Sequence, residues 1–317
     1  MGTKTILLPL TKHTTLTAQI LTIASKRGSR DVSFRIARAA DASVPDQLAV
    51  DAVRTKSPWL IPERSDYVVD FTKTKDLSKT MEGCDGVVLA SGHDDPLLVE
   101  NELNVLESAH ASGVQDILKV SCAEGLVGAN SSVGFGQQHW MVEQRLLELG
   151  FAGNVRILRP STLMDVFLRG KLFEMICGRS LSVSVKRGCV AFVHPTDVVD
   201  VINKLLAQST PGGSTTTHAL TGPEALSFQQ VAQQLSQGIH DQVTYSYFPL
   251  WAVQPSMWIR GERPEAIASE ITLARARESG FEASVTSDIQ ELLGRPPRTF
   301  QEFVKEHHES WPLQAFK

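Results

Sequence analysis

The sequence predicts an α/β protein in which a Rossmann-like, doubly wound parallel sheet is joined to a smaller C-terminal substrate lobe. Two observations favour this fold class. Short apolar runs alternate with helical patterns through the first half of the chain, as in β-α-β units. These runs are apolar nearly throughout, which is typical of strands that are covered on both faces. A chain of 317 residues is also long enough for a large domain and a second lobe.

The expected elements follow in chain order. In the first half we expect strands at 5–10, 31–38, 66–71, 86–91, 116–122 and 154–160, with helices up to about 27 and over 96–112 and 139–149. Beyond residue 160 the pattern predicts a strand and helix over 188–208, a strand at 217–222 and an amphipathic helix over 227–239 that Ser227 caps. The Rossmann-like core is therefore expected over 1–163, completed by about 188–222, and the smaller lobe over 164–187 and 223–317.

Composition excludes several classes of function. A net charge of −4 without a dense Lys/Arg cluster argues against nucleic acid as a ligand. No apolar run approaches the roughly 18 residues that a membrane helix requires, so no membrane partner is expected. The 4 cysteines are scattered without CxxC pairs, and HxxxH and HExxH are absent, which predicts no metal site. Without a secretory signal pattern, we expect a cytoplasmic protein.

Four stretches carry a resemblance to a known family: GCDGVVLASG (83–92), HWMVEQRLLELG with RILRPSTLMD (139–165), HALTGPEALSFQQVAQQLS (218–236) and GRPPRTFQEFV (294–304). They resemble the NmrA-like branch of the atypical short-chain dehydrogenase/reductases, and more narrowly the fungal festuclavine and agroclavine dehydrogenase type. The resemblance implies a Rossmann domain with a C-terminal substrate lobe and NAD(P)H-dependent reduction of small molecules, often in secondary metabolism. It also implies that some relatives bind the cofactor as sensors without catalysis.

The nucleotide-binding turn departs from that family. The glycines of its GxxGxxG motif fall on Leu10, His13 and Leu16. Leu10 stiffens the tight turn, His13 puts a ring where a backbone N–H should face the pyrophosphate, and Leu16 crowds the helix or the phosphate. We therefore expect that no cofactor is required, with NADPH as the cofactor if the reductase alternative holds.

Other positions of the nucleotide site are partly kept. The candidate cofactor-binding residues are Thr11, Lys12, His13, Arg38, Asp70, Phe71 and Ser91. The resemblance places Arg38 at the adenosine 2′-phosphate and Asp70 with Phe71 at the adenine. Ser91 ends a strand at the crevice where doubly wound proteins bind ligands. The alternative is that Arg38 is a surface charge and Asp70 a strand-end cap.

The family's Tyr-x-x-x-Lys segment is replaced as well, because its two places hold Phe135 and His139. Phe135 cannot donate a proton. His139 is the first catalytic candidate, since an imidazole serves as acid or base near neutral pH; the alternative is a helix-start residue. Glu143, at i+4, could orient the ring or be an ordinary helix-face charge.

Two further catalytic candidates are Ser121 and Asp165. Ser121 matches the substrate-side serine of the superfamily and could orient a carbonyl or hydroxyl group, or simply tie a loop. A half-buried carboxylate at Asp165 would have a raised pKa and could handle protons; the alternative is the N-cap of the next helix.

An aromatic-rich stretch, residues 243–261, predicts a substrate pocket for a small apolar metabolite, or else packing of the small lobe. The candidate substrate-binding residues are Phe135, Trp140, Thr162, Met164, Tyr247, Trp251 and Trp258. Three functions stay open. The first is cofactor-independent acid–base chemistry (isomerisation, cyclisation or dehydration), the second is NAD(P)H-dependent reduction, and the third is a non-catalytic regulatory role. A homodimer also stays open.

Overall fold

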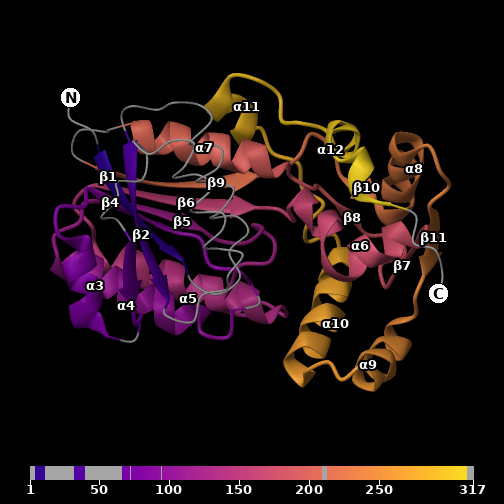
Figure 1. The fold of residues 1–317 in the computed structure, drawn as a ribbon, viewed down its shortest axis with the longest axis horizontal. Coiled ribbons are helices and arrows are strands. Elements are labelled where there is room, and N and C mark those ends of the chain that lie inside the picture. The colour runs from indigo at the N-terminus through magenta and orange to yellow at the C-terminus, as the bar shows by residue number, and fades with distance from the viewer. Residues whose placement is uncertain are drawn as a thin grey trace. The chain divides into compact units, whose positions relative to one another are not determined.

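The computed structural model describes residues 4–10, 32–39, 66–71, 73–93, 95–208 and 213–312. Seven strands form one sheet in the order β3-β2-β1-β4-β5-β6-β9 (Figure 1). Their bounds are β1 Lys4–Leu10, β2 Val32–Ala39, β3 Asp66–Val69, β4 Gly86–Leu89, β5 Asp116–Val120, β6 Asn154–Pro160 and β9 Ser214–Leu220. The five pairings from β3 to β6 are all parallel. The predicted doubly wound sheet is confirmed, and its strand order reverses between β1 and β4.

Helices cover both faces of this sheet. Figure 1 shows α3 (Thr74–Met81), α4 (Leu98–Ala111) and α5 (Gly134–Leu149) on one face and α7 (Pro195–Ala207) on the other. Apolar side chains of β4 and β5 pack with residues of α4 and α5 in one buried cluster. All four residues of β4 are buried. This two-sided burial is the reason why a central strand such as β4 is apolar throughout rather than alternating.

The start of the nucleotide-binding turn is described only up to Leu10. This residue is still a strand residue, paired with Arg38 in the register of β1 and β2. Of the predicted cofactor residues, Thr11, Lys12 and His13 lie outside the described residues, as does Leu16.

Contacts along the chain divide it into two compact units. The first comprises residues 1–121, 138–159 and 199–218, and the second comprises 122–137, 160–198 and 219–317. Residues 122–137, which the sequence pattern assigns to the core domain, pack with the second unit. The division falls within α5, between Gln137 and Gln138.

The second unit is built from short elements. They are η1 Met164–Leu168, α6 Gly170–Cys177, β7 Ser180–Val183, β8 Cys189–Val190, β10 Leu226–Ser227, α8 Phe228–Ile239, β11 Thr244–Tyr247, α9 Leu250–Ile259, α10 Pro264–Glu278, α11 Asp288–Leu293, α12 Phe300–Glu306 and η2 His308–Ser310. Strand β8 pairs antiparallel with β10, and β7 pairs parallel with β11. Ser227 caps α8 as predicted, in a reciprocal capping box with Gln230.

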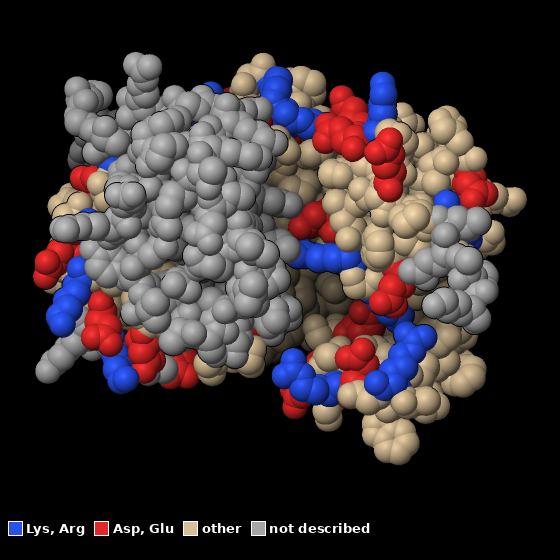
Figure 2. Space-filling model, viewed as in Figure 1, with Lys and Arg blue, Asp and Glu red and all other residues tan. Residues whose placement is uncertain are grey.

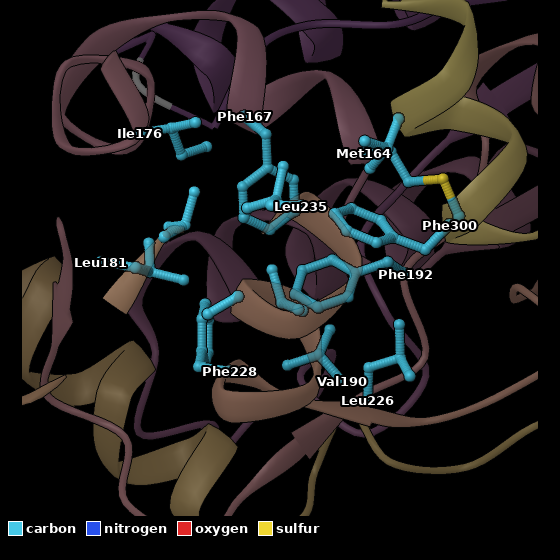
Figure 3. Packing of buried hydrophobic residues seen from close by; sticks show 14 of the residues in the cluster. Met164, Phe167, Ile176, Leu181, Val190, Phe192, Leu226, Phe228, Leu235 and Phe300 are labelled. Carbon is cyan, nitrogen blue, oxygen red and sulfur yellow. The ribbon is translucent and has the colours of Figure 1, made fainter. Parts of the chain in front are cut away.

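An aromatic core holds the second unit together. Phe167, Phe192 and Phe300 meet edge to face or tilted, with ring centroids 5.1–6.1 Å apart (Figure 3). Trp311 is also buried against this cluster, and its indole Nε1 donates to the carbonyl oxygen of Phe167 at 2.7 Å. Because the indole N–H has this partner, the ring is buried without an unpaired donor.

The C-terminal segment is held by one buried carboxylate. Asp197, in the first turn of α7, is fully buried and accepts from the side chains of Arg295 (2.6 Å) and Arg298 and from the backbone N–H of Arg298 (2.7 Å). Charge-assisted bonds to guanidinium groups satisfy this buried charge. The arginines of the GRPPRTF motif thus have a structural role.

Candidate active site

A buried ammonium lies beneath the carboxyl end of the first unit's sheet. Lys119 of β5 is fully buried, and its Nζ lies 3.0 Å from Oε1 and 2.7 Å from Oε2 of Glu102 on α4, which is also buried. Nζ also donates to the carbonyl oxygen of Val120 at 2.7 Å. Lysine is almost never fully buried unless it is paired. The pair therefore brings α4 and β5 together at one defined point.

His139 completes the surroundings of this ammonium. The Nδ1 atom of His139 lies 3.0 Å from Lys119 Nζ, and its Nε2 lies 3.0 Å from Nδ1 of His93. The two rings meet edge to face with centroids 5.1 Å apart. Burial, and then the positive charge of Lys119, hold the pKa of His139 well below its usual value. His139 is therefore a neutral imidazole at neutral pH.

The alternative prediction that His139 lies at the start of a helix is wrong. Helix α5 begins at Gly134, so His139 lies in its second turn rather than at its start. His139 can contact β5 because the spacing of residues along one face of α5 matches the spacing along one face of β5. Residues four apart on a helix are separated by about 6 Å, and residues two apart on a strand by about 6.6 Å. The pairs Lys119 with His139 and Ser121 with Glu143 use this match.

The second of these pairs fixes the Ser121 hydroxyl. Ser121 Oγ donates to Glu143 Oε1 at 2.5 Å, and Arg159 donates to both oxygens of the same carboxylate at 3.3 and 2.5 Å. Glu143 thus binds Ser121 and Arg159 rather than the His139 ring. Since the hydroxyl proton is already donated, Ser121 can accept from a ligand's O–H but cannot donate to a carbonyl oxygen. Its catalytic role stays a prediction.

His93 connects the buried network to the surface. It follows β4, and its ring is exposed. The nearby Ser91 is half-buried, and its backbone N–H lies 3.4 Å from Glu102 Oε1. The network thus runs from Glu102 through Lys119 and His139 to His93, at the ends of β4 and β5. In open α/β sheets, ligands bind at this edge, near the point where the strand order reverses.

Sequence reasoning missed Glu102, Lys119 and His93. One signal was available, because Lys119 interrupts the otherwise apolar strand run of β5. A charged residue within a strand that is covered on both faces indicates a buried partner. Nothing local in the sequence identifies that partner as Glu102 or His139.

The remaining cofactor candidates lie at neighbouring strand ends. Asp70 follows β3, is exposed and pairs with Lys73 at 2.9 Å, whereas Phe71 is buried. Arg38 lies at the end of β2, beside Leu10 and Val68 in the sheet register. Its side chain lies outside the described part of the structure. The carboxyl ends of β2 and β3 therefore carry the positions that the resemblance assigns to the nucleotide, and Ser91 follows β4 at the edge where doubly wound sheets bind ligands.

Two of the substrate candidates belong to the second unit's interior. Met164 is 1% exposed and packs in the aromatic core near Phe300 (Figure 3). Thr162 Oγ1 donates to Glu282 at 2.6 Å and accepts from Arg277 at 2.9 Å. Both side chains have structural partners, and substrate contact there stays a prediction.

Asp165 is not the N-cap of a helix, because it lies inside the short helix η1, whose N-cap is Leu163. Burial raises the pKa of its carboxyl, and the nearby Arg169 guanidinium, at 3.2 Å, partly opposes this. The expectation of a raised pKa agrees with this environment. A proton-handling role for Asp165 stays a prediction.

The aromatic candidates divide into buried and exposed groups. Phe135 packs in a small apolar cluster of the second unit, and Trp140 is half-buried. Tyr247, Trp251 and Trp258 are 41%, 80% and 74% exposed. The exposure of these last three argues against packing of the lobe interior, and substrate binding by them stays a prediction.

The residues that the structure describes contain no group of three or more His, Cys, Asp or Glu side chains placed to hold a metal ion. None of the described helices has the length and apolarity that a membrane span needs. On the face drawn in Figure 2, acidic and basic side chains of the described surface are interspersed.

No family model matches the chain, although several curated proteins are similar to it. It is 25% identical over 161 residues to agroclavine dehydrogenase of Claviceps fusiformis, covering 50% of this chain and 55% of that protein. It is 26% identical over 237 residues to (4-alkanoyl-5-oxo-2,5-dihydrofuran-3-yl)methyl phosphate reductase of Streptomyces griseus, covering 74% and 80%. The match to agroclavine dehydrogenase thus spans about half of that protein's length.

Solved structures agree on the fold. The NADPH complex of the Escherichia coli quinone oxidoreductase QOR2 has a TM-score of 0.75 at 17% identity, covering 95% of this chain and 99% of the other. NmrA, a negative transcriptional regulator solved with NAD, has a TM-score of 0.74 at 13% identity, covering 98% and 96%.

The sheet, its switch point and these structures define a protein of the Rossmann-like NAD(P)-binding fold. Within that class the chain is similar to the NmrA-like atypical short-chain dehydrogenase/reductases, near the clavine dehydrogenase type, which confirms the resemblance. Most of the similar curated proteins are named as dehydrogenases, reductases or an oxidoreductase. The comparisons therefore favour an oxidoreductase over cofactor-independent isomerisation, and they do not support the expectation that no cofactor is required.

Proposed function

We propose that this protein is an NAD(P)H-dependent reductase of small apolar metabolites. One observation carries the proposal: a proton-donor network of imidazole and ammonium groups lies at the carboxyl ends of β4 and β5. These ends border the switch point at which doubly wound sheets bind nucleotides. The reductase named among the relatives and the NADPH complex among the similar structures support it.

The chemistry of this donor set fits a nicotinamide cofactor. When bound, NAD(P)H supplies a hydride to an acceptor, and each hydride delivered to a carbonyl or quinone requires one proton from elsewhere. His93, His139 and Lys119 carry transferable protons at the correct edge of the sheet. The positions that would hold the nucleotide are Arg38 and Asp70.

One observation favours a second candidate, the cofactor-independent acid–base chemistry predicted first from the sequence. Leu10 stands where the family has the first glycine, and it is still paired as a strand residue. A Cβ and a bulky side chain at this place oppose the close approach of a pyrophosphate. The buried network would then serve proton transfer alone.

The test is titration of the purified protein with NADPH and with NADH by calorimetry and thermal shift. A ligand that binds only the folded state raises its apparent stability. We expect micromolar binding of NADPH, followed by NADPH oxidation with an acceptor from a panel of quinones, unsaturated lactones and azo dyes. Absence of binding at millimolar concentration of both nucleotides would refute the reductase function and favour the second candidate.

Arg38 provides an internal check on cofactor choice. Replacing Arg38 by Ala should weaken NADPH binding more than NADH binding, because only NADPH carries the 2′-phosphate. The matched control is Lys79→Ala, which removes an exposed positive charge from α3 in the same unit. Equal weakening of both nucleotides would remove Arg38 from phosphate recognition.

A further inference from the structure

The hydrogen bonds around Lys119 determine which nitrogen of each histidine carries a proton. An ammonium has three N–H donors and no acceptor. Those of Lys119 face Glu102, the carbonyl oxygen of Val120 and Nδ1 of His139. The contact with His139 is therefore a hydrogen bond in which Nδ1 is the acceptor, so His139 cannot carry a proton on Nδ1.

A neutral imidazole has one protonated nitrogen, which for His139 must be Nε2. Burial and the adjacent ammonium keep His139 neutral. Its Nε2–H then donates to Nδ1 of His93 at 3.0 Å. This makes Nδ1 of His93 an acceptor and leaves the His93 proton on Nε2. One buried lysine thus sets the tautomer of two histidines in series, and the second of them is exposed.

We propose that His93 is the catalytic proton donor of this site, and that Lys119 supplies the proton to it through His139. This inference rests on the proposed reductase function. The substrate class is an acceptor whose reduction leaves a negative charge on oxygen: a ketone, a quinone or an unsaturated carbonyl compound. Neither histidine is named as a donor by the Tyr-x-x-x-Lys pattern, whose tyrosine place holds Phe135.

The proton transfer balances without a charged imidazole. The Nε2–H bond of His93 breaks as an O–H bond forms on the substrate oxyanion. The proton on Nε2 of His139 moves to Nδ1 of His93, and a proton of Lys119 moves to Nδ1 of His139. Both histidines exchange tautomers and stay neutral, while the ammonium becomes an amine and the oxyanion becomes a hydroxyl group. A solvent proton that enters at His93 restores the chain in the reverse direction.

This arrangement has a physical advantage over a lone imidazolium. A positive charge on His139 would lie 3.0 Å from the Lys119 ammonium in a buried site, which like-charge repulsion and desolvation oppose. Holding the stored proton on Lys119, beside Glu102, keeps the charge paired until it is needed. His139 is accordingly a positioning and relay residue, and His93 is the residue that meets the substrate.

The first test is independent of the cofactor and of turnover. Long-range ¹H–¹⁵N NMR spectra of the unliganded, ¹⁵N-histidine-labelled protein distinguish the two tautomers, and His93→Ala and His139→Gln assign the two signals. We expect protonated Nε2 and unprotonated Nδ1 in both residues at neutral pH. A proton on Nδ1 of either residue would overturn the inference.

A paired substitution tests the role of the ammonium without leaving a lone buried charge. Lys119→Met combined with Glu102→Gln removes both charges, and circular dichroism shows whether the fold is kept. We expect His139 to lose its fixed tautomer in this double variant and to populate the Nδ1–H form. Retention of a pure Nε2–H form in a folded double variant would contradict control by Lys119. His110→Ala, an exposed histidine in α4, is the matched control and should leave the spectra of the pair unchanged.

The second test separates this inference from the proposed function. With NADPH and a quinone, or an unsaturated lactone if that is the better acceptor, His93→Ala should lower kcat by about 10²- to 10⁴-fold, as expected for loss of a general acid. The affinity for NADPH should stay within twofold, roughly the scatter expected where a mutation leaves uniform binding intact. An unchanged kcat would overturn the inference and leave the reductase function standing. If the protein binds no nicotinamide nucleotide, the proposed function fails and proton delivery to a reduced substrate fails with it, whatever the tautomers are.

Discussion

The ion pair between Lys119 and Glu102 allows a quantitative prediction. Their side chains are 0% and 2% exposed, and Nζ lies 2.7 Å from Oε2. Lys119→Met leaves the Glu102 carboxylate buried without its cation, with the backbone N–H of Ser91 at 3.4 Å as a weak donor. Removing one partner of a buried pair costs about 3–5 kcal/mol, and we expect a comparable loss for Glu102→Gln.

The double variant should behave differently from the sum of the two single variants. Because Met and Gln are both neutral, neither leaves an uncompensated charge, and the stability should return to within about 2 kcal/mol of the unmodified protein. The coupling free energy between the two sites, which is the sum of the two single losses less the loss of the double variant, should therefore be at least about 4 kcal/mol. The assay is urea denaturation of all four proteins, followed by circular dichroism.

A surface pair between α4 and α5 serves as the control. Arg145 of α5 and Glu107 of α4 lie 2.6 Å apart, but their side chains are 39% and 44% exposed. The cycle Arg145→Met with Glu107→Gln should give a far smaller coupling, because solvent screens an exposed ion pair. If the double variant at Lys119 and Glu102 loses as much as both single variants together, the buried charges are not coupled and the reasoning is refuted.

Three further predictions concern the second unit. Asp197→Ala should lower the free energy of unfolding by about 3–5 kcal/mol in urea titrations, because two arginine side chains and a backbone N–H lose a buried carboxylate. The matched comparison is Asp241→Ala, which should lower it far less, because the Asp241 carboxylate that pairs with Arg179 is exposed to solvent. Asp165→Asn should raise Tm at neutral pH. Burial raises the pKa of the Asp165 carboxyl in the folded state, so its ionisation above about pH 4 favours the unfolded state. Asn cannot ionise, so the gain in Tm should be present at neutral pH and should vanish as the pH falls to about 4. A gain that is the same at every pH would contradict this. Ser227→Ala should cost about 1 kcal/mol through loss of the capping box, whereas an unchanged unfolding midpoint would show that the cap is not needed.

Much of the fold was predictable from the sequence because two-sided burial leaves a direct trace in it. The strands β1, β4, β5 and β6 coincide with largely apolar runs, whereas the edge strand β9 (STTTHAL) does not, and Ser227 marks the start of α8. The start of α5 was missed by five residues. Gly134 and Gly136 lower the helix propensity there, but a Cβ at position 136 would collide with the carbonyl oxygen of Leu126, so close packing requires that glycine.

The site was predictable only in part, for a different reason. His139 was identified from its place in the family's catalytic segment, and the structure gives it buried polar partners. Glu102, Lys119 and His93 come from three separate elements, and their meeting depends on the register of β4 and β5 and on the rotation of α4. No local pattern encodes that register. The GRPPRTF motif is the most specific part of the resemblance, and in the structure its two arginines bind the buried carboxylate of Asp197.

The packing of Trp311 against Phe167 has a consequence for the synthesis of the chain. The aromatic cluster around Phe167 contains residues that lie between Met164 and Trp311 in the chain. The ribosome synthesises these segments in order, so more than a hundred residues are added after Phe167 before Trp311 is available to pack against it. Until then an apolar surface on the nascent chain stays uncovered, and chaperones that bind such surfaces have their longest opportunity on this unit. Codon changes that slow translation before residue 311 should therefore lower the soluble yield more than the same changes placed near residue 100.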